Sequence, residues 1–314
     1  MKSINNFQVL LLSLVMFTAV LLVSCGGGIK PTDKDTPTTG HVRIGVDNSY
    51  ALLVDAERNT FLHFYPYASI DTMSGSEADI INAFMVDSIP LMVVSRKLTP
   101  EEEARLKTQQ IYPKTTMIAH DAVAFIVNKE NPDTALFYDK IESIFRGNVK
   151  SWKDINPKSP LNELKVVFDS YKSANTRYFR EKFNLEKLPA TCFALENSQQ
   201  VIDHVEKNKG AIGVISVNWV SDKEDTVSHT FLGKIKVVAI SRPGNNDPGT
   251  DFYTPHPGYV VEGYYPFTRD VYVINRQTYY GMGYGFSSFL AGEKGQLIIL
   301  RAGMVPASMP LRLV

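Results

Sequence analysis

The sequence predicts an α/β protein with two lobes. Short runs of β-branched and aromatic residues alternate with segments of helical spacing along most of the chain, as in folds whose strands and helices pack in layers. After an N-terminal stretch with few apolar residues, roughly 275 residues remain, which is enough for two lobes. One strand-like segment, 116–128, is long and carries the polar pair His120 and Asp121 in its middle, so we expect it to cross between the lobes.

The first 24 residues are expected to be a signal peptide. Lys2 gives a short positive start, and residues 9–23 form an almost unbroken apolar run, typical of a signal-peptide core and short for a membrane span. The run ends before Cys25 in a pattern that resembles a bacterial lipobox, so we expect lipid on Cys25 to anchor the protein. A plain signal anchor is the alternative. Residues 25–40 are mostly Gly, Pro, Thr, Lys and Asp and are expected to be a flexible tether.

The elements of the first half follow from apolar patterns and helix caps. They are strands at 41–47, 64–70 and 89–94, with helices at 50–64 and from Ser76. Thr99, with Pro100 and three glutamates behind it, predicts another helix start, because it supplies an N-cap, a proline in the first turn and negative charge near the positive helix end.

The second half continues the alternation of strands and helices. A helix that contains Ile141, Ile144 and Phe145 is expected to end at Gly147, followed by a turn packed by Trp152. Further strands are expected at 166–168, 210–215 and 235–240, helices at 173–183, 198–207, 286–290 and 296–302, and a loop-rich stretch at 241–260. A last strand, 265–275, is expected to return the chain to the first lobe, and Pro266, Thr268 and the His120–Asp121 pair are candidate hinge positions.

Polar residues follow several of the predicted strands. Ligands of open α/β sheets bind at the carboxyl ends of strands, which gives five candidate donors: Asn48, Ser49, Ser76, Ser95 and Arg96. Asp47 is interpreted as a helix cap, because its carboxylate would repel a bound anion. A lone arginine such as Arg96 has the alternative of being a solvated surface residue.

The stretch 166–179 is the one around which the chain is organised. A buried strand at 166–168 is followed by a polar loop and then by Ser173, Asn175 and Thr176 at a helix start. The first N–H groups of a helix lack internal partners and carry positive potential, so they bind anions. The alternative is an ordinary capped helix, since Ser, Asn and Thr are favoured caps.

Composition narrows the function classes. Lysine plus arginine and aspartate plus glutamate each number 33, for a formal charge of zero, which gives no support to nucleic-acid binding. Besides Cys25 there is only Cys192, expected to be a buried, unreactive thiol. We find no metal-ligand cluster, no Gly-x-Ser-x-Gly elbow and no Cys/His pair. We therefore expect neither an enzyme nor a cofactor or metal, and His120 is interpreted as a hydrogen-bonded structural residue.

Several motifs in order resemble the phosphate-binding proteins of ABC transporters, especially lipoprotein members from Bacteroidetes-like bacteria. They are the lipobox and residues 118–128, 144–147, 152–155, 173–177, 210–214, 265–269 and 303–310. The resemblance implies a type II periplasmic-binding-protein fold, with two α/β lobes joined by two crossing segments and a ligand cleft between them. The implied first lobe is 41–121 with 263–314, and the second is 122–262.

The resemblance carries over to the site only in part. The family's central turn is an arginine, a short gap and Ser-Gly-Thr, whereas here Ala174 or Asn175 replaces the glycine, and Asp169 or Ser170 stands where the arginine is expected. The family's aspartate after the third strand falls near Arg96. The carboxylate and the guanidinium are therefore hypothesised to have exchanged lobes, so that Arg96 donates to the anion while Asp169 orients Arg96 or accepts the ligand's proton.

The function implied is capture of inorganic phosphate or a similar oxyanion and delivery to an ABC permease. The protein would be a monomer in the cell envelope, held by lipid on Cys25 and facing the periplasm. The alternative is a related sensor or interaction protein that holds another oxyanion or no small ligand.

Overall fold

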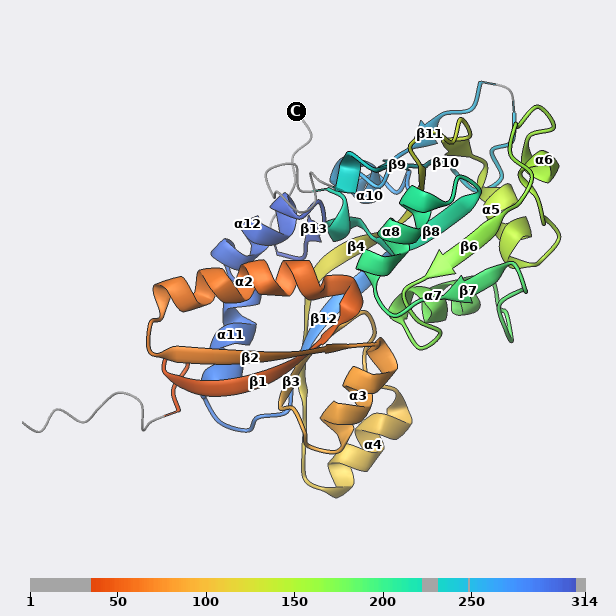
Figure 1. Cartoon of the computed structure of the whole chain (residues 1–314). Helices are drawn as coiled ribbons and strands as arrows, with labels where there is room; N and C mark the ends of the chain where they lie inside the picture. The colour runs from red at the N-terminus through yellow and green to blue at the C-terminus, as the bar shows by residue number, and fades with distance from the viewer. Residues whose placement is uncertain (1–34, 222–230, 248, 309–314) are drawn as a thin grey trace, which may run out of the picture.

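The structure, a computed structural model, describes residues 35–221, 231–247 and 249–308. It confirms the predicted α/β fold with two lobes, which lie side by side in Figure 1. The main sheet runs in the order β2-β1-β3-β12-β4-β8-β6-β7. Its strands are β1 (Gly40–Asp47), β2 (Ala68–Gly75), β3 (Leu91–Val94), β4 (Lys114–Asn128), β6 (Lys165–Phe168), β7 (Cys192–Ala194), β8 (Ala211–Ser216) and β12 (Thr268–Asn275).

Helices and short strands make up the rest of the described fold. The helices are α2 (Ala51–Phe64), α3 (Glu77–Met85), α4 (Pro100–Thr108), α5 (Tyr138–Phe145), α6 (Trp152–Ile155), α7 (Ala174–Lys182), α8 (Ser198–Lys207), α10 (Pro257–Val261), α11 (Met282–Ala291) and α12 (Glu293–Arg301), with 3-10 turns η2 (Asn48–Tyr50) and η3 (Val217–Trp219). The short strands are β5 (Ala135–Leu136), β9 (Ile235–Val237), β10 (Ala239–Ser241), β11 (Phe252–Tyr253) and β13 (Val305–Pro306).

The first lobe is a sheet with helices on both faces. In it β1 pairs in parallel with β2 and β3, and β12 pairs antiparallel with β3. Alternate residues of β3 point to opposite faces: Leu91 and Val93 join the core beneath α2 and α11, whereas Met92 and Val94 join the core beneath α3 and α4. The continuous apolar run of this strand therefore reflects burial on both faces.

Two adjacent antiparallel strands, β4 and β12, connect the lobes (Figure 1). Along β4, Ala122 is the last residue that pairs with β12, and Val123 is the first that pairs with β8 of the second lobe. His120 Nδ1 lies 2.7 Å from Asp270 Oδ1 on β12, which confirms the interpretation of His120 as a hydrogen-bonded structural residue. The lobe boundaries expected at 121/122 and 262/263 stay a prediction.

An aromatic cluster fixes α7 to the second lobe. The rings of Phe145 on α5 and Phe179 on α7 stack with centroids 4.3 Å apart, and both contact Phe168 at the end of β6. All three side chains are buried. Phe168 is the last residue of β6, before the turn at 173–177 (the central turn), and Phe179 lies in α7 just after this turn. The packing of the two rings therefore sets where the central turn lies.

Some predicted boundaries are wrong. Helix α2 runs to Phe64, so β2 begins at Ala68 instead of residue 64. The segment 235–240, predicted as one strand, is split into β9, which pairs with β4, and β10, which belongs to a separate sheet with β5 and β11. The stretch 241–260, expected to be loop-rich, also contains β11 and most of α10.

The end of the predicted tether is attached to the first lobe. Met282 N donates to Asp35 Oδ1 at 2.8 Å, and Tyr279 Oη donates to Asp35 Oδ2 at 2.7 Å. The flexible tether expected to reach residue 40 is therefore shorter at its C-terminal end. Cys25 and the rest of the predicted signal peptide and tether lie outside the described residues. The longest helix in the described part, α2, has 14 residues, and none there is long and apolar enough to cross a membrane.

Candidate functional site

The central turn is a capped helix start. Ser173 is the N-cap of α7: its Oγ accepts from Thr176 N at 3.2 Å and donates to Ser170 O at 2.9 Å. Thr176 Oγ1 donates to the same carbonyl at 2.6 Å. Ala174 is fully buried. The hydroxyl donors that the sequence suggested for an anion are thus used within the turn, as the capping alternative predicts.

Asp169 and Asn175 lie just inside the turn, and both are fully buried. Asn175 Nδ2 donates to Asp169 Oδ2 at 3.2 Å. Within the described residues, the remaining oxygens, Asp169 Oδ1 and Asn175 Oδ1, have no hydrogen-bond partner. Burial raises the pKa of Asp169 above its ordinary value, because removal from water penalises the charged form.

The end of β1 supplies a second group of buried polar atoms. Ser49 N donates to Asp47 Oδ1 at 2.7 Å, which confirms Asp47 as a cap. Asp47 Oδ2 and Ser49 Oγ are buried without a partner in the described part of the chain. Burial, and then the nearby carboxylates of Glu77 and Asp169, raise the pKa of Asp47 to about 7. Asn48 is half-buried, and its Nδ2 donates to Glu196 O across the lobes at 3.4 Å.

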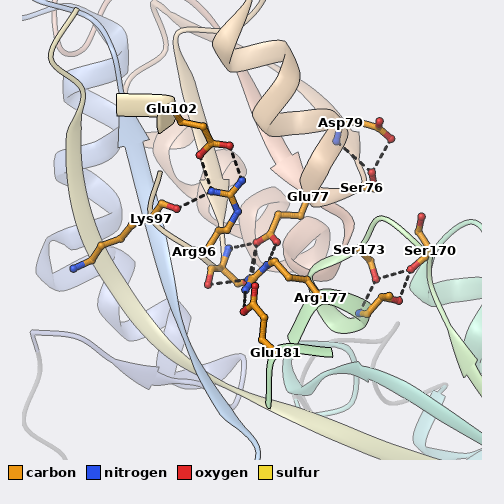
Figure 2. A network of polar contacts seen from close by, with 12 residues as sticks. Ser76, Glu77, Asp79, Arg96, Lys97, Glu102, Ser170, Ser173, Arg177 and Glu181 are labelled. Atoms are coloured by element: carbon orange, nitrogen blue, oxygen red, sulfur yellow. Dashed lines mark hydrogen bonds and ion pairs between the residues drawn. The ribbon is translucent and has the colours of Figure 1, made fainter. Parts of the chain in front are cut away.

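The remaining candidates are engaged inside the first lobe. Ser76 Oγ caps α3, accepting from Asp79 N and donating to Asp79 Oδ2 at 2.6 Å. Arg96 Nη1 and Nη2 each donate to Glu102 at 2.7 Å, a two-fold contact drawn in Figure 2. The hypothesis that Asp169 orients Arg96 is therefore wrong, because the facing carboxylate belongs to Glu102 at the start of α4.

The most buried cation of the site is Arg269 on β12, which is not among the site residues predicted from the sequence. Its side chain is 4% exposed, its Nε donates to Asp121 Oδ2 at 2.9 Å, and it lies over the Tyr50 ring at 5.4 Å. Asp121 is also held by Ser216 Oγ at 2.7 Å. Arg269 Nη1 has no hydrogen-bond partner among the described residues. Arg269 lies in one of the motifs that resemble the family, 265–269, but the sequence does not show that its guanidinium turns inward.

The buried polar atoms gather where the lobes meet. Asn218, which follows β8, donates through Nδ2 to Ser49 O at 2.7 Å, while its Oδ1 is unpartnered in the described chain. Burial raises the pKa values of Asp47 and Asp169, and this is the larger effect. The nearby positive charge of Arg269 lowers both pKa values to a smaller extent. The site thus combines N–H groups of one guanidinium with several acceptor oxygens from both lobes. Buried polar groups normally have partners, so these atoms mark a place for a ligand that brings both charge and hydrogen-bond donors.

An ion pair between Glu77 and Arg177, which the sequence did not predict, lies beside the site. Glu77 accepts from Arg177 Nε at 2.5 Å and from Ser95 N and Oγ at 3.0 and 2.8 Å. Ser95, a candidate ligand donor, is therefore occupied by a carboxylate of the protein itself. Among the described residues, no group of three or more His, Cys, Asp or Glu side chains is arranged to hold a metal ion.

Residues 31–294 match the family model of the PBP superfamily domain. The chain belongs to the PBP superfamily. The phosphate-binding protein PstS of Staphylococcus haemolyticus is 26% identical over 224 residues, covering 69% of this chain and 70% of that protein. PstS of Staphylococcus saprophyticus is 22% identical over 273 residues, covering 87% and 81%.

Solved structures of other proteins show the same fold. A Clostridium perfringens protein assigned as a phosphate ABC transporter substrate-binding protein, solved with bound phosphate, has a TM-score of 0.71 at 23% identity, covering 85% of this chain and all of that one. An ABC-type phosphate transport receptor from Vibrio cholerae has a TM-score of 0.60 at 19% identity, covering 86% and 100%. The matched proteins are binding proteins, which confirms the prediction that this chain is not an enzyme.

Proposed function

We propose that the protein binds inorganic phosphate between its lobes and delivers it to an ABC permease. The observation that carries this proposal is Arg269 Nη1, which is buried, has no hydrogen-bond partner in the described part of the chain, and belongs to a guanidinium close enough to Asp47 and Asp169 to lower their pKa values. A guanidinium in such surroundings binds an oxyanion strongly. The relatives named above include phosphate-binding proteins and an ABC-type phosphate transport receptor, which supports phosphate as the oxyanion and a permease as the partner.

The same geometry supports selection of a ligand that carries protons. Asp47 Oδ2 and Asp169 Oδ1 are buried and have no hydrogen-bond partner among the described residues, so either oxygen can accept a hydrogen bond from a ligand. A fully deprotonated anion beside ionised Asp47 or Asp169 would be repelled. A phosphate O–H group can instead donate to either carboxylate, whereas sulfate has no proton to offer. In this proposal Asp169 keeps the role of proton acceptor suggested by the sequence, and Arg269 replaces Arg96 as the cation.

Isothermal titration of the full-length chain in detergent with phosphate and with sulfate tests the proposal. We expect tight phosphate binding and at least about a hundredfold weaker sulfate binding, the usual scale when a site's buried polar groups lose their partners. Arg269→Gln should abolish phosphate binding. Arg96→Gln is the matched control and should leave it unchanged, because Arg96 is occupied by Glu102.

Arg269→Gln alone leaves Asp121 buried without its cation, which can unfold the protein. The double variant Arg269→Gln/Asp121→Asn removes both charges, so it leaves no buried charge unpaired and still tests the role of Arg269. Its folding is checked by circular dichroism. Phosphate binding by this double variant equal to that of the wild type would refute the role of Arg269. Failure of the folded wild type to bind either anion would refute the proposed function and favour a sensor or interaction protein.

We also propose that lipid on Cys25 holds the protein in the cell envelope, facing the periplasm. The support is the apolar run at 9–23 followed by Cys25. Metabolic labelling with a palmitate analogue should mark the wild type and not Cys25→Ser. Equal labelling of both proteins would refute the anchor.

A further inference from the structure

The ion pair between Glu77 and Arg177 joins the two lobes. Glu77 is the first residue of α3 in the first lobe, and Arg177 lies in the first turns of α7 in the second. Arg177 Nε donates to Glu77 Oε2 at 2.5 Å, and Nη2 reaches Glu77 Oε1 at 3.3 Å. Figure 2 shows the two side chains pointing toward each other from their separate helices.

The first lobe holds Glu77 ready for this contact. Ser95 N and Ser95 Oγ, at the end of β3, both donate to Glu77 Oε1, and Arg177 Nη2 donates to Ser95 Oγ at 2.9 Å. Arg177 Nη1 is held in turn by Glu181 Oε2 at 2.6 Å, one turn along α7. Each charge thus keeps a fixed geometry within its own lobe, so little side-chain entropy is lost when the lobes meet.

Further contacts bind the same two segments together. Ala78 N, in the first turn of α3, donates to Lys172 O at 3.3 Å. Lys172 Nζ lies 3.2 Å from Asp79 Oδ1. The loop that leads into Ser173 is therefore attached to the start of α3, and it also contains Asp169 near the proposed phosphate site.

Burial makes the Glu77–Arg177 contact stronger than the other pairs on this surface. The Glu77 side chain is 3% exposed and that of Arg177 is 25% exposed, whereas Lys172 and Asp79 are 66% and 49% exposed. Exposed ion pairs contribute little because water and salt screen them. A buried carboxylate without its partner is costly, so separation of Arg177 from Glu77 is opposed more strongly than separation of Lys172 from Asp79.

We infer that Glu77 and Arg177 are positioning residues that latch the lobes together and so set the affinity for the anion held between them. This inference rests on the proposed phosphate site. Within the described chain, neither side chain has a hydrogen bond to Asp47, Asp169 or Arg269. The Glu77 carboxylate acts on the site through its field, which helps to raise the pKa of Asp47. Beyond that, the two residues act on the ligand through the closed arrangement of the lobes, which holds Asp47 and Asp169 at one place.

The sign of the effect of Glu77→Gln distinguishes a latch from a mere neighbouring charge. Removal of a negative charge near an anion site should tighten phosphate binding if Glu77 acts only through its field. Loss of the latch should weaken binding instead, by roughly 5- to 150-fold, the usual range of coupling between two sites. Arg177→Gln should weaken binding to a similar extent, and Arg177→Lys, which keeps the charge with fewer directed donors, should weaken it less.

A double-variant cycle with a matched control completes the test. If the residues act as one latch, Glu77→Gln/Arg177→Gln should bind phosphate no more weakly than the worse single variant. Arg96 and Glu102 form an equally close pair within the first lobe, so Glu102→Gln should leave the affinity unchanged. Tighter binding by Glu77→Gln, or additive losses in the double variant, would overturn the inference.

X-ray scattering separates this inference from the proposed function. Without phosphate, Glu77→Gln and Arg177→Gln should each have a larger radius of gyration than the wild type, whereas Glu102→Gln should not. This result would support the latch even if the wild type bound no phosphate, in which case only the proposed function would fail. Identical scattering from the wild type and both latch variants would overturn the latch.

Discussion

Glu57 gives a stability prediction whose size follows from the structure. This residue lies on the inner face of α2, is fully buried, and has no hydrogen-bond partner for either carboxyl oxygen among the described residues. Burial alone raises the pKa of Glu57 from 4.5 to about 9. The folded protein therefore keeps a proton on Glu57 at neutral pH, whereas the unfolded chain releases it.

The sign of the pH dependence follows from this difference. The folded-state pKa of Glu57 is the higher one. Well below pH 4.5 Glu57 is protonated in both the folded and the unfolded state, so its contribution to stability does not change with pH there. Between pH 4.5 and about 9 only the folded state keeps the proton, and the stability of the fold falls as the pH rises. Each pH unit in this window costs about 1.4 kcal/mol. Between pH 6 and pH 8.5, Glu57 should lower the free energy of unfolding by up to about 3 kcal/mol.

Urea unfolding of the wild type and of Glu57→Gln at both pH values measures this effect. Glutamine has nearly the same shape and carries no titrating proton, so other groups cancel in the comparison. The free energy of unfolding of the variant, minus that of the wild type, should rise by about 3 kcal/mol from pH 6 to pH 8.5. A pH-independent difference would show that Glu57 is ionised in the fold, and the reasoning from burial would be refuted.

Three further predictions concern the second lobe. Phe179→Ala should lower the free energy of unfolding by about 3–5 kcal/mol, measured in urea, while Phe179→Leu should lose less; an equal loss in both would argue against ring packing as the cause. Ser173→Ala removes the cap of α7 and should cost about 1 kcal/mol in the same assay; no measurable loss would show that the cap hydrogen bond is replaced by water. Cys192, whose pKa burial raises to about 12, should react with a thiol reagent such as DTNB only after denaturation, and rapid reaction of the folded protein would contradict its burial.

Local patterns in the sequence were sufficient for most helices and strands. Thr99 caps α4 with Pro100 in the first turn and Glu102 completing the capping box, because the groups involved lie within a few residues of one another. Ser173 caps α7 for the same reason. The long strand β4 was also predictable, since its apolar run and its polar middle are both visible in the sequence.

Where ordering depends on distant partners, the sequence was a poorer guide. The segment 235–240 has one apolar pattern, but β9 and β10 pair with different strands, and no local signal distinguishes those partners. Residues 35–39 look like tether in composition, yet Asp35 is held by Tyr279 and Met282, more than two hundred residues further along the chain.

The sequence by itself determined the α/β fold with two lobes and the region where polar residues end the strands. Only the tertiary structure decided which of these residues are free for a ligand. Arg96 and Ser95 look available in the sequence, but Glu102 and Glu77 occupy them. Arg269 looks like any arginine on a strand, yet it is a buried cation whose Nη1 has no hydrogen-bond partner within residues 35–221, 231–247 and 249–308. The physical reason is that a donor is available only when no neighbour satisfies it, and here the satisfying neighbours come from other elements of the fold.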